Sequence, residues 1–188
     1  MLRIISGEHK GRMIKTLPGR HTRPTADRVK EALFNILQTK LHGSLILDLF
    51  SGTGNIGLEA MSRGAEKVVF VEKNPAALHI LRENCRSLEY AEFVDILPFD
   101  VKKALEILSK QGLLFDIVFM DPPYDKGLEV PTIKHLDQVN LLKETGIIAV
   151  EHMSCSDLPR IIGDFIKYDL KKYGKTTISF YRKRSCNQ

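Results

Sequence analysis

The sequence of 188 residues predicts one α/β domain with a Rossmann-like, doubly wound, mostly parallel sheet of seven strands and a small N-terminal extension. Three observations support this fold class. Strand-like and helix-like runs alternate from residue 44 onward, a glycine-rich turn follows the first of these strands, and two more strand-like runs flank Gly174. Repeated strand-helix units favour parallel pairing, and the closing pair is expected to supply an antiparallel last strand.

The N-terminal extension is expected to span residues 1–24, and residues 25–188 are expected to form the main domain. The stretch "LRIISGEHKGRMIKTL" has two short β-rich runs around a polar turn that contains glycine, a pattern typical of a β-hairpin. A basic loop, "PGRHTRPT", then leads into a helix with Thr25 as the expected N-cap. Apolar residues recur on one face of that helix, which predicts packing against the domain core.

The elements of the main domain are placed by their apolar patterns. The expected strands are Leu45–Phe50, Lys67–Val71, Glu92–Ile96, Asp116–Met120 and Gly146–Val150. The expected helices are Ile56–Ser62, Pro75–Leu88, Val101–Ser109 and roughly Val130–Leu142. In an open sheet of this kind, ligands bind beyond the carboxyl ends of the strands, near the point where the strand order reverses.

The composition is that of an ordinary globular protein, with 43% hydrophobic and 27% charged residues. The apolar runs are too short to cross a bilayer, and the N-terminal segment has no apolar signal-peptide core. We therefore expect a cytoplasmic protein without membrane contact. Three widely spaced cysteines and scattered histidines predict neither a disulfide framework nor a metal site.

The net charge of +5 is distributed unevenly along the chain. Residues 1–30 hold eight Lys and Arg against two acids, and residues 167–188 hold seven against one. Residues 31–166 hold thirteen Lys and Arg against twenty acids. Two basic ends around an acidic centre are compatible with solvated termini and also with contact to a polyanion such as nucleic acid.

The glycine-rich turn reads Gly52-Thr53-Gly54-Asn55-Ile56-Gly57, a G-x-G-x-x-G pattern. Glu72 closes the next strand about 20 residues later, where an acid accepts hydrogen bonds from ribose hydroxyls. These two features fit NAD and S-adenosylmethionine equally well. Asp48 separates the two, because a carboxylate four residues before Gly52 would repel a pyrophosphate but attract the ammonium and sulfonium of S-adenosylmethionine. The sequence therefore favours the methyl donor, with a turn-capping role for Asp48 as the alternative.

The fourth expected strand ends in Asp121-Pro122-Pro123-Tyr124, on the same edge of the sheet as the glycine-rich turn. The Asp121 carboxylate and the Pro122 carbonyl can each accept one N–H bond from an exocyclic amine, which frees the nitrogen lone pair. The prolines restrict the backbone that holds these acceptors. Tyr124 can stack on a base that has left its helix. This arrangement predicts direct methyl transfer to a base amine, whereas a rigid turn is the structural alternative.

Three stretches carry a resemblance to a known family: "RPTADRVKEALFNIL", "DLFSGTGNIGLEA" and "DPPY". Together they resemble the RsmD family over nearly the whole chain. Members are class I S-adenosylmethionine-dependent methyltransferases that act on the N2 amine of a guanine in 16S ribosomal RNA of the small subunit. The resemblance implies the same cofactor, with S-adenosylhomocysteine as product, and the same substrate, within the small subunit or an assembly intermediate.

The resemblance also implies roles for individual residues. Asp48, Gly52 and Gly54 would hold the amino-acid end of the donor, Glu72 its ribose and Asp100 its adenine amine. The tetrapeptide Asp121 to Tyr124 would form the target-base site. Further residues expected to border the cofactor are Ser51, Thr53, Lys73, Asn74 and Phe99.

The basic residues near the N-terminus are candidates for RNA phosphate contacts. They are Lys10, Arg12, Arg20, Arg23 and Arg28, and the alternative is a solvated basic surface. A DNA adenine-N6 methyltransferase and a protein-glutamine N5 methyltransferase share the logic of amine activation. A nucleic-acid-binding module without activity is a further reading, which the intact "DPPY" disfavours. A monomer is the default expectation.

Overall fold

The computed structural model describes residues 2–18, 24–124 and 126–184, and the side chains of residues 24–26 are not considered. Among these residues the helices are α1 (Pro24–Leu41), α2 (Asn55–Ser62), α3 (Pro75–Ser87), α4 (Val101–Lys110) and α5 (Glu129–Gln138). The strands are β1 (Leu2–Arg3), β2 (Met13–Ile14), β3 (Leu45–Leu49), β4 (Lys67–Val71), β5 (Val94–Leu97), β6 (Phe115–Met120), β7 (Leu142–Met153), β8 (Ile161–Ile162), β9 (Phe165–Tyr173) and β10 (Thr176–Lys183).

The large sheet has the strand order β5-β4-β3-β6-β7-β10-β9-β8. Strands β3 to β7 pair in parallel, whereas β10, β9 and β8 run antiparallel to their neighbours. The chain moves outward from β3 to β5 on one side and from β6 to β7 on the other. The order therefore reverses between β3 and β6, which is where open α/β sheets bind ligands.

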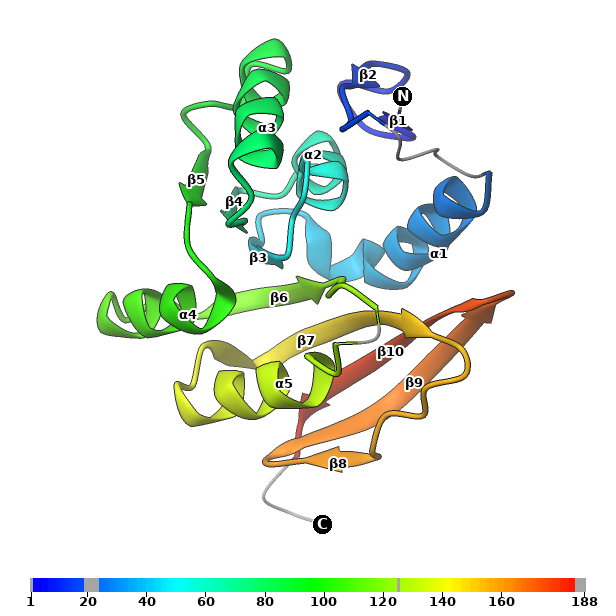
Figure 1. Ribbon diagram of the computed structural model, residues 1–188, viewed down its shortest axis with the longest axis vertical. Helices are drawn as coiled ribbons and strands as arrows, with labels where there is room; N and C mark the ends of the chain where they lie inside the picture. Colours follow the sequence, from blue (N-terminus) through cyan, green and yellow to red (C-terminus); the bar gives the residue numbers. More distant parts are fainter. Residues whose placement is uncertain (1, 19–23, 125, 185–188) are drawn as a thin grey trace.

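Helices cover both faces of this sheet (Figure 1). One core combines apolar residues of α1, α2 and α3 with alternate strand residues such as Ile46, Phe70 and Phe119. The other core combines α4 and α5 with the intervening residues, such as Leu47 and Val118. Successive strand side chains point to opposite faces, so nearly continuous apolar strands are required to fill both layers.

The predicted fold class is confirmed, including the antiparallel closing strand, but the sheet has eight strands and not seven. The additional strand is β8, which pairs Ile161 with Ile166 and Ile162 with Phe165. Gly163 adopts a φ of 56°, which permits the tight reversal between these pairs. A two-residue strand leaves too little alternation to be recognised in the sequence.

The boundary between α5 and β7 also differs from the prediction. The helix ends at Gln138 and not near Leu142, because Asn140 adopts a left-handed φ of 48°. Leu142 is instead the first residue of β7, where it is fully buried and pairs with Phe115. Helix α1 begins at Pro24, so the expected N-cap Thr25 lies within its first turn.

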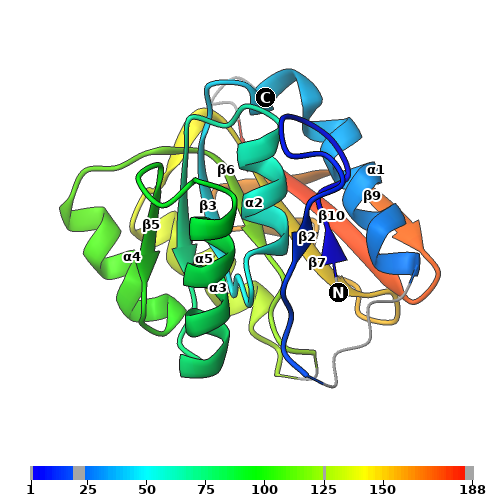
Figure 2. The ribbon, with the colours of Figure 1, turned by 90° about the horizontal axis from the view of Figure 1, so that it is seen from above.

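Strands β1 and β2 form the expected N-terminal hairpin as a separate two-stranded sheet beside α2 (Figure 2). Glu59 of α2 holds the hairpin to the domain, although its side chain is completely buried. Its carboxylate accepts hydrogen bonds from the Ile5 and Ser6 amides at 2.8 and 3.0 Å. It also pairs with Lys30 at 3.1 Å and with Arg63 at 2.7 Å. The hairpin is therefore anchored through a buried charged network.

The turn of the hairpin lies against the carboxyl ends of two helices. Gly7 packs so closely on Ser62 that a Cβ at this position would lie 1.7 Å from the Ser62 carbonyl oxygen. Arg12 donates a 2.7 Å hydrogen bond to the Ser87 carbonyl at the end of α3. Since helices α2 and α3 begin at the ligand-binding edge of the sheet, the turn lies at their opposite ends. None of the helices in the described part of the chain is long and apolar enough to cross a membrane.

Candidate functional site

Two adjoining clefts open at the carboxyl edge of the parallel strands. The first cleft has a volume of about 1170 Å³. It contains many of the residues singled out in the sequence: Gly52, Glu72, Lys73, Asn74, Phe99, Asp100, Asp121, Pro122, Pro123 and Tyr124. The structure thus brings together segments that follow β3, β4, β5 and β6. Parallel strands direct their carboxyl ends to one edge, so this convergence follows from the topology.

The second cleft has a volume of about 750 Å³ and lies between the parallel edge, α1 and the two hairpins. The predicted residues along it are Asp48, Ser51, Gly52, Thr53, Asp121 and Tyr124. The two clefts share Leu17, Phe50, Gly52, Asp121 and Tyr124. A ligand in one cleft can therefore meet a ligand in the other beside Asp121.

The three glycines of the turn are each required for a different structural reason. Gly52 has a φ of 55°, and a Cβ there would meet no atom within 4 Å, so this backbone borders open space in both clefts. Gly54 has a φ of 88° at the start of α2, and a Cβ would lie 2.5 Å from Leu81. A Cβ on Gly57 would lie 2.2 Å from the Phe70 ring, so this glycine permits close packing of α2 on β4. Only Gly52 borders the clefts directly.

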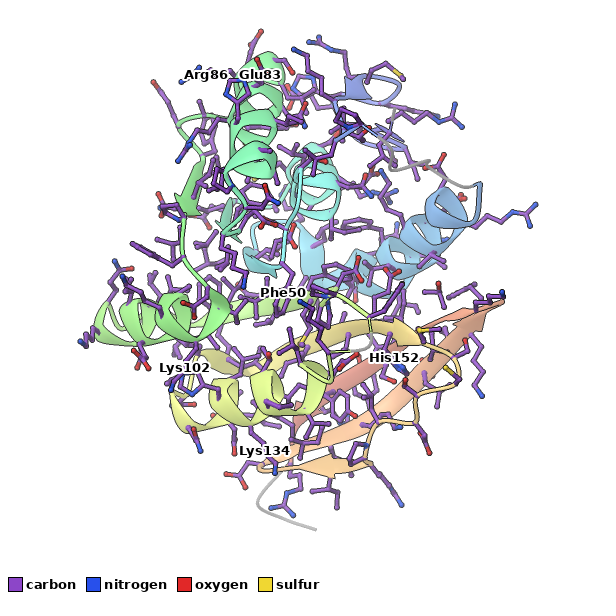
Figure 3. All side chains as sticks on the ribbon, in the orientation of Figure 1. Phe50, Glu83, Arg86, Lys102, Lys134 and His152 are labelled. Atoms are coloured by element: carbon purple, nitrogen blue, oxygen red, sulfur yellow. The ribbon has the colours of Figure 1, made fainter. Side chains whose placement is uncertain are left out.

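Phe50 is a site residue that the sequence reasoning missed. Phe50, which is labelled in Figure 3, has a φ of 61°, a strained value for an aromatic residue. Its side chain borders both clefts. The strained turn carries the chain from β3 into the glycine-rich turn. No simple sequence pattern reveals such a conformation, because only the assembled edge of the sheet imposes it.

Asp48 lies at the second cleft and is almost completely buried. Its Oδ2 accepts a 3.0 Å hydrogen bond from the Gly57 amide, so it caps the first turn of α2. Burial raises the pKa of Asp48 to about 7, and the neighbouring charge of Glu72 adds to this effect. The capping role and a position beside the cleft, considered as alternatives from sequence, are both present.

Glu72 connects the glycine-rich turn to the start of α3. Its Oε2 accepts from the Gly52 amide at 2.9 Å, and its Oε1 accepts from the Lys73 and Asn74 amides at 2.8 Å each. Asn74 in turn caps α3, because its Oδ1 accepts from the Ala76 amide at 2.9 Å. This carboxylate therefore fixes two loops of the first cleft in addition to bordering it.

Asp100 is the N-cap of α4, where its Oδ1 accepts a 3.1 Å bond from the Lys103 amide. The Lys103 ammonium lies 4.3 Å from the centre of the Phe99 ring in a cation–π contact. Both Phe99 and Asp100 border the first cleft, so the structure offers an apolar ring beside a carboxylate. Such a pair suits a flat heterocycle that carries an amine.

The tetrapeptide after β6 occupies the junction of the clefts, with Pro122 buried and Tyr124 exposed by 43%. The Tyr124 hydroxyl donates a 3.3 Å hydrogen bond to Oε1 of Glu151. Burial, together with the charges of Glu151 and Asp121, raises the pKa of Tyr124 above its usual value. Burial also raises the pKa of Glu151. Tyr124 thus remains a hydrogen-bond donor at neutral pH.

Glu151 is the second residue that the sequence reasoning missed, and it borders the second cleft. The signal for it exists in the sequence. "IIAVE" places an acid directly after an apolar strand, as "ILD", "VFVE" and "VFMD" do for the acids that were recognised. The prediction ended this strand at Val150, whereas β7 continues to Met153 and includes Glu151.

The proposed nucleic-acid residues do not form one group. Lys10 and Arg12 lie in the hairpin turn, at the opposite ends of α2 and α3 from the clefts. Arg28 is exposed on α1. Arg20 and Arg23 lie outside the described residues. At the second cleft, the basic residue contributed by the carboxyl-terminal hairpin is Lys175.

The reversal of strand order, the glycine-rich turn and the acids after successive strands define a class I methyltransferase fold and site. Comparisons with known proteins place it more narrowly. The family model "Conserved hypothetical protein 95" matches residues 2–182. The chain belongs to this family, the RsmD family of methyltransferases.

Full-length relatives are similar over almost the whole chain. "Ribosomal RNA small subunit methyltransferase D" of Haemophilus influenzae is 37% identical, covering 96% of this chain and 92% of the relative. The Escherichia coli K12 protein of the same name is 32% identical, covering 98% and 91%. The solved structure of yhhF from Escherichia coli superposes with a TM-score of 0.84 at 32% identity, covering 97% of this chain and 98% of that one.

S-adenosylmethionine is the cofactor that the sequence leads us to expect. A more distant solved structure, SMU.776, is complexed with S-adenosylhomocysteine; it has a TM-score of 0.68 at 15% identity and covers 85% of this chain and 50% of that one. The residues present here fit the cofactor. Gly52 leaves open space at the cleft wall. Asp48 is an acid whose pKa is raised by burial to about 7. Phe99 and Asp100 offer a place for the adenine.

Proposed function

We propose that this protein methylates the exocyclic N2 amine of a guanine in 16S ribosomal RNA, within the small ribosomal subunit or an assembly intermediate. The observation that carries the proposal is the position of Asp121 and Tyr124 where the two clefts meet. The first cleft has the residues for the adenosine part of the donor, and the second cleft has room for a flipped base beside them. The names of the full-length relatives support ribosomal RNA as the substrate.

The cofactor supplies an electrophilic methyl group on a sulfonium. In the proposed reaction the Asp121 carboxylate and the Pro122 carbonyl accept the two amine N–H bonds, so the nitrogen lone pair faces the methyl carbon. As the C–N bond would form, the bond between the methyl carbon and sulfur would break and S-adenosylhomocysteine would leave. Positive charge would develop on the amine, and Asp121 would stabilise that charge. A proton then leaves the amine through Asp121 to solvent. Tyr124 stacks on the base and holds it at the junction, an interaction worth about 1–3 kcal/mol.

The residues proposed for the donor act through their observed positions. Asp48 pairs with its ammonium group, and the Gly52 backbone, with Ser51, Thr53 and Gly54 beside it, shapes the wall next to its amino-acid end. Glu72 accepts from the ribose while Lys73 and Asn74 follow on the same loop. Phe99 and Asp100 meet the adenine. Variants of each residue can test these roles. The division of the chain into an extension of residues 1–24 and a methyltransferase domain of residues 25–188 is likewise a proposal.

Because the pKa of Asp48 is raised, we expect the binding of S-adenosylmethionine to depend on pH. Asp48 is protonated below its pKa of about 7 and then cannot pair with the donor's ammonium. We expect donor affinity to fall on the order of tenfold between about pH 7.5 and 5.5, since one pKa unit corresponds to about 1.4 kcal/mol. Calorimetry at several pH values measures this. In Asp48→Asn, whose carboxamide oxygen can still accept from Gly57, the dependence should flatten; an unchanged slope would contradict the assignment.

If the second cleft contacts RNA phosphates, the affinity for RNA should depend on salt concentration. We expect Lys175→Gln to reduce the slope of log Kobs against log salt by about 0.7–0.9, the value for one lost phosphate contact. Filter binding to small-subunit RNA gives the slope. Lys110→Gln, exposed at the carboxyl end of α4, serves as the matched control. Equal slopes in both variants would remove Lys175 from the interface, and Arg20→Gln and Arg23→Gln can be measured in the same way.

The deciding experiment offers labelled donor with three substrates: small ribosomal subunits, free 16S RNA and duplex DNA. Labelled N2-methylguanine in the RNA of one of the first two supports the proposal, and mapping gives the nucleotide. Label at adenine N6 in DNA would instead support a DNA methyltransferase. Label on a glutamine of an added protein extract would support the protein-methylating alternative. The elution volume in size-exclusion chromatography tests the expected monomer.

A further inference from the structure

We propose that Glu151 reads the target guanine by accepting its N1–H, which makes this carboxylate a specificity-determining residue; the inference rests on the guanine-N2 activity proposed above. Two independent observations carry it. One is the register that places Glu151 beside Asp121, and the other is its position in the wall of the second cleft. The chemistry of the guanine edge joins them.

The register follows from the pairing of β6 and β7. These strands are parallel neighbours, and the last pair between them is Met120 with Val150. Asp121 directly follows β6, and Glu151 is the next residue of β7. Since neighbouring strands lie about 4.8 Å apart, the backbones at these two acidic residues are close neighbours at the edge of the sheet.

The surroundings of Glu151 allow its carboxylate to accept a hydrogen bond from a ligand. Its side chain is half-buried in the second cleft, and Oε1 accepts from the Tyr124 hydroxyl at 3.3 Å. A carboxylate has room for about four hydrogen bonds, so the Tyr124 contact leaves capacity for a ligand. Burial raises the pKa of Glu151, because desolvation disfavours its charged form. The Tyr124 bond also aligns the ring that would stack on the base.

The two acceptors match guanine better than other bases that carry an amine. In guanine the N2 amine lies next to N1–H, so both neighbouring positions are donors. In adenine the N6 amine lies next to N1, and in cytosine the N4 amine lies next to N3, and both of these ring nitrogens are acceptors. If such a ring nitrogen faced Glu151, two hydrogen-bond acceptors, the nitrogen and the carboxylate, would lie next to each other with no hydrogen to share. The pair formed by Asp121 and Glu151 therefore selects for guanine through its Watson–Crick edge.

A base analogue tests this reading directly. 2,6-Diaminopurine keeps the N2 amine of guanine but has an acceptor at N1. With RNA that carries it at the mapped nucleotide, we expect wild-type kcat/KM to fall on the order of 100-fold relative to guanosine, because a buried acceptor loses its donor. In Glu151→Gln the carboxamide offers a donor as well as an acceptor. The variant should be slower on guanosine, and its preference for guanosine should shrink at least tenfold.

Two controls separate reading of the base from other effects. Tyr124→Phe removes the hydroxyl that bonds Glu151 but keeps the ring, so the preference for guanosine should be retained at whatever rate the variant shows. Glu144→Gln, an exposed acid on the same strand, should leave both rates unchanged. A preference in Glu151→Gln equal to that of wild type would overturn the inference. Absence of N2-methylguanine in the mapping experiment would instead overturn the proposed function, so the two failures are distinguishable.

Discussion

Replacement of Asp121 by alanine is expected to reduce kcat on the order of 10²–10³-fold while donor affinity changes little. The carboxylate lies at the junction of the two clefts, where the proposed amine becomes positively charged. Loss of this acceptor removes the stabilisation of that charge and one of the two bonds that orient the lone pair. Single-turnover methylation of small-subunit RNA measures the rate, and calorimetry measures donor binding.

Two further variants show which property of Asp121 matters and serve as a control. Asp121→Asn keeps an acceptor oxygen without the charge, and an intermediate rate would separate orientation of the amine from charge stabilisation. Asp95→Ala removes an exposed acid of β5, paired with Lys67, and should leave the rate unchanged. Turnover by Asp121→Ala at the wild-type rate would exclude Asp121 from the reaction.

Replacement of Glu59 by alanine is expected to lower the free energy of unfolding by about 3–5 kcal/mol. The substitution leaves the buried Lys30 ammonium without its carboxylate partner, although it keeps hydrogen bonds to Arg3 and Asn55. It also leaves the Ile5 and Ser6 amides without their acceptor. For a chain of this size, the melting temperature should fall by roughly 2–4 °C for each kcal/mol. Urea denaturation and calorimetry measure the two quantities.

The matched control is Glu83→Ala, which removes exposed ion pairs with Lys15 and His79 and should cost about 0–1 kcal/mol. If Glu59→Ala fails to fold, Lys30→Met combined with Glu59→Met removes both charges but still leaves the hairpin amides without an acceptor. Limited proteolysis should then cut the hairpin before the domain. Equal losses in Glu59→Ala and Glu83→Ala would show that the buried network does not hold the hairpin.

The main features of the fold were predictable from sequence because apolar periodicity determines which residues can fill two layers. The parallel strands, the helices between them and both hairpins were placed within a few residues. Strand β8 was missed because two isoleucines give no alternation, and its pairing depends on the positive φ of Gly163. The end of α5 was misplaced because the left-handed conformation of Asn140 stops the helix before its apolar pattern ends.

The candidate site was predictable where an acid or glycine follows a strand, since topology alone brings such positions together. Asp48, Glu72 and Asp121 were found in this way. The positive φ of Phe50 could not be foreseen, because no simple sequence pattern marks such a conformation in an aromatic residue. The bonds from the Ile5 and Ser6 amides to Glu59 could not be foreseen either, since they join residues more than fifty positions apart. Long-range polar contacts leave no periodic signal in a sequence.

The anchoring of the hairpin has a consequence for synthesis of the chain. Residues 5–15 emerge from the ribosome early, but their acceptors at Glu59, Ser62, Asn84 and Ser87 are made much later. At about 5–20 residues per second, the first strands wait roughly 4–16 seconds before their docking surface has been synthesised. The N-terminal segment can therefore complete its contacts with the domain only after residue 87 has been synthesised, although it is the first part of the chain to appear.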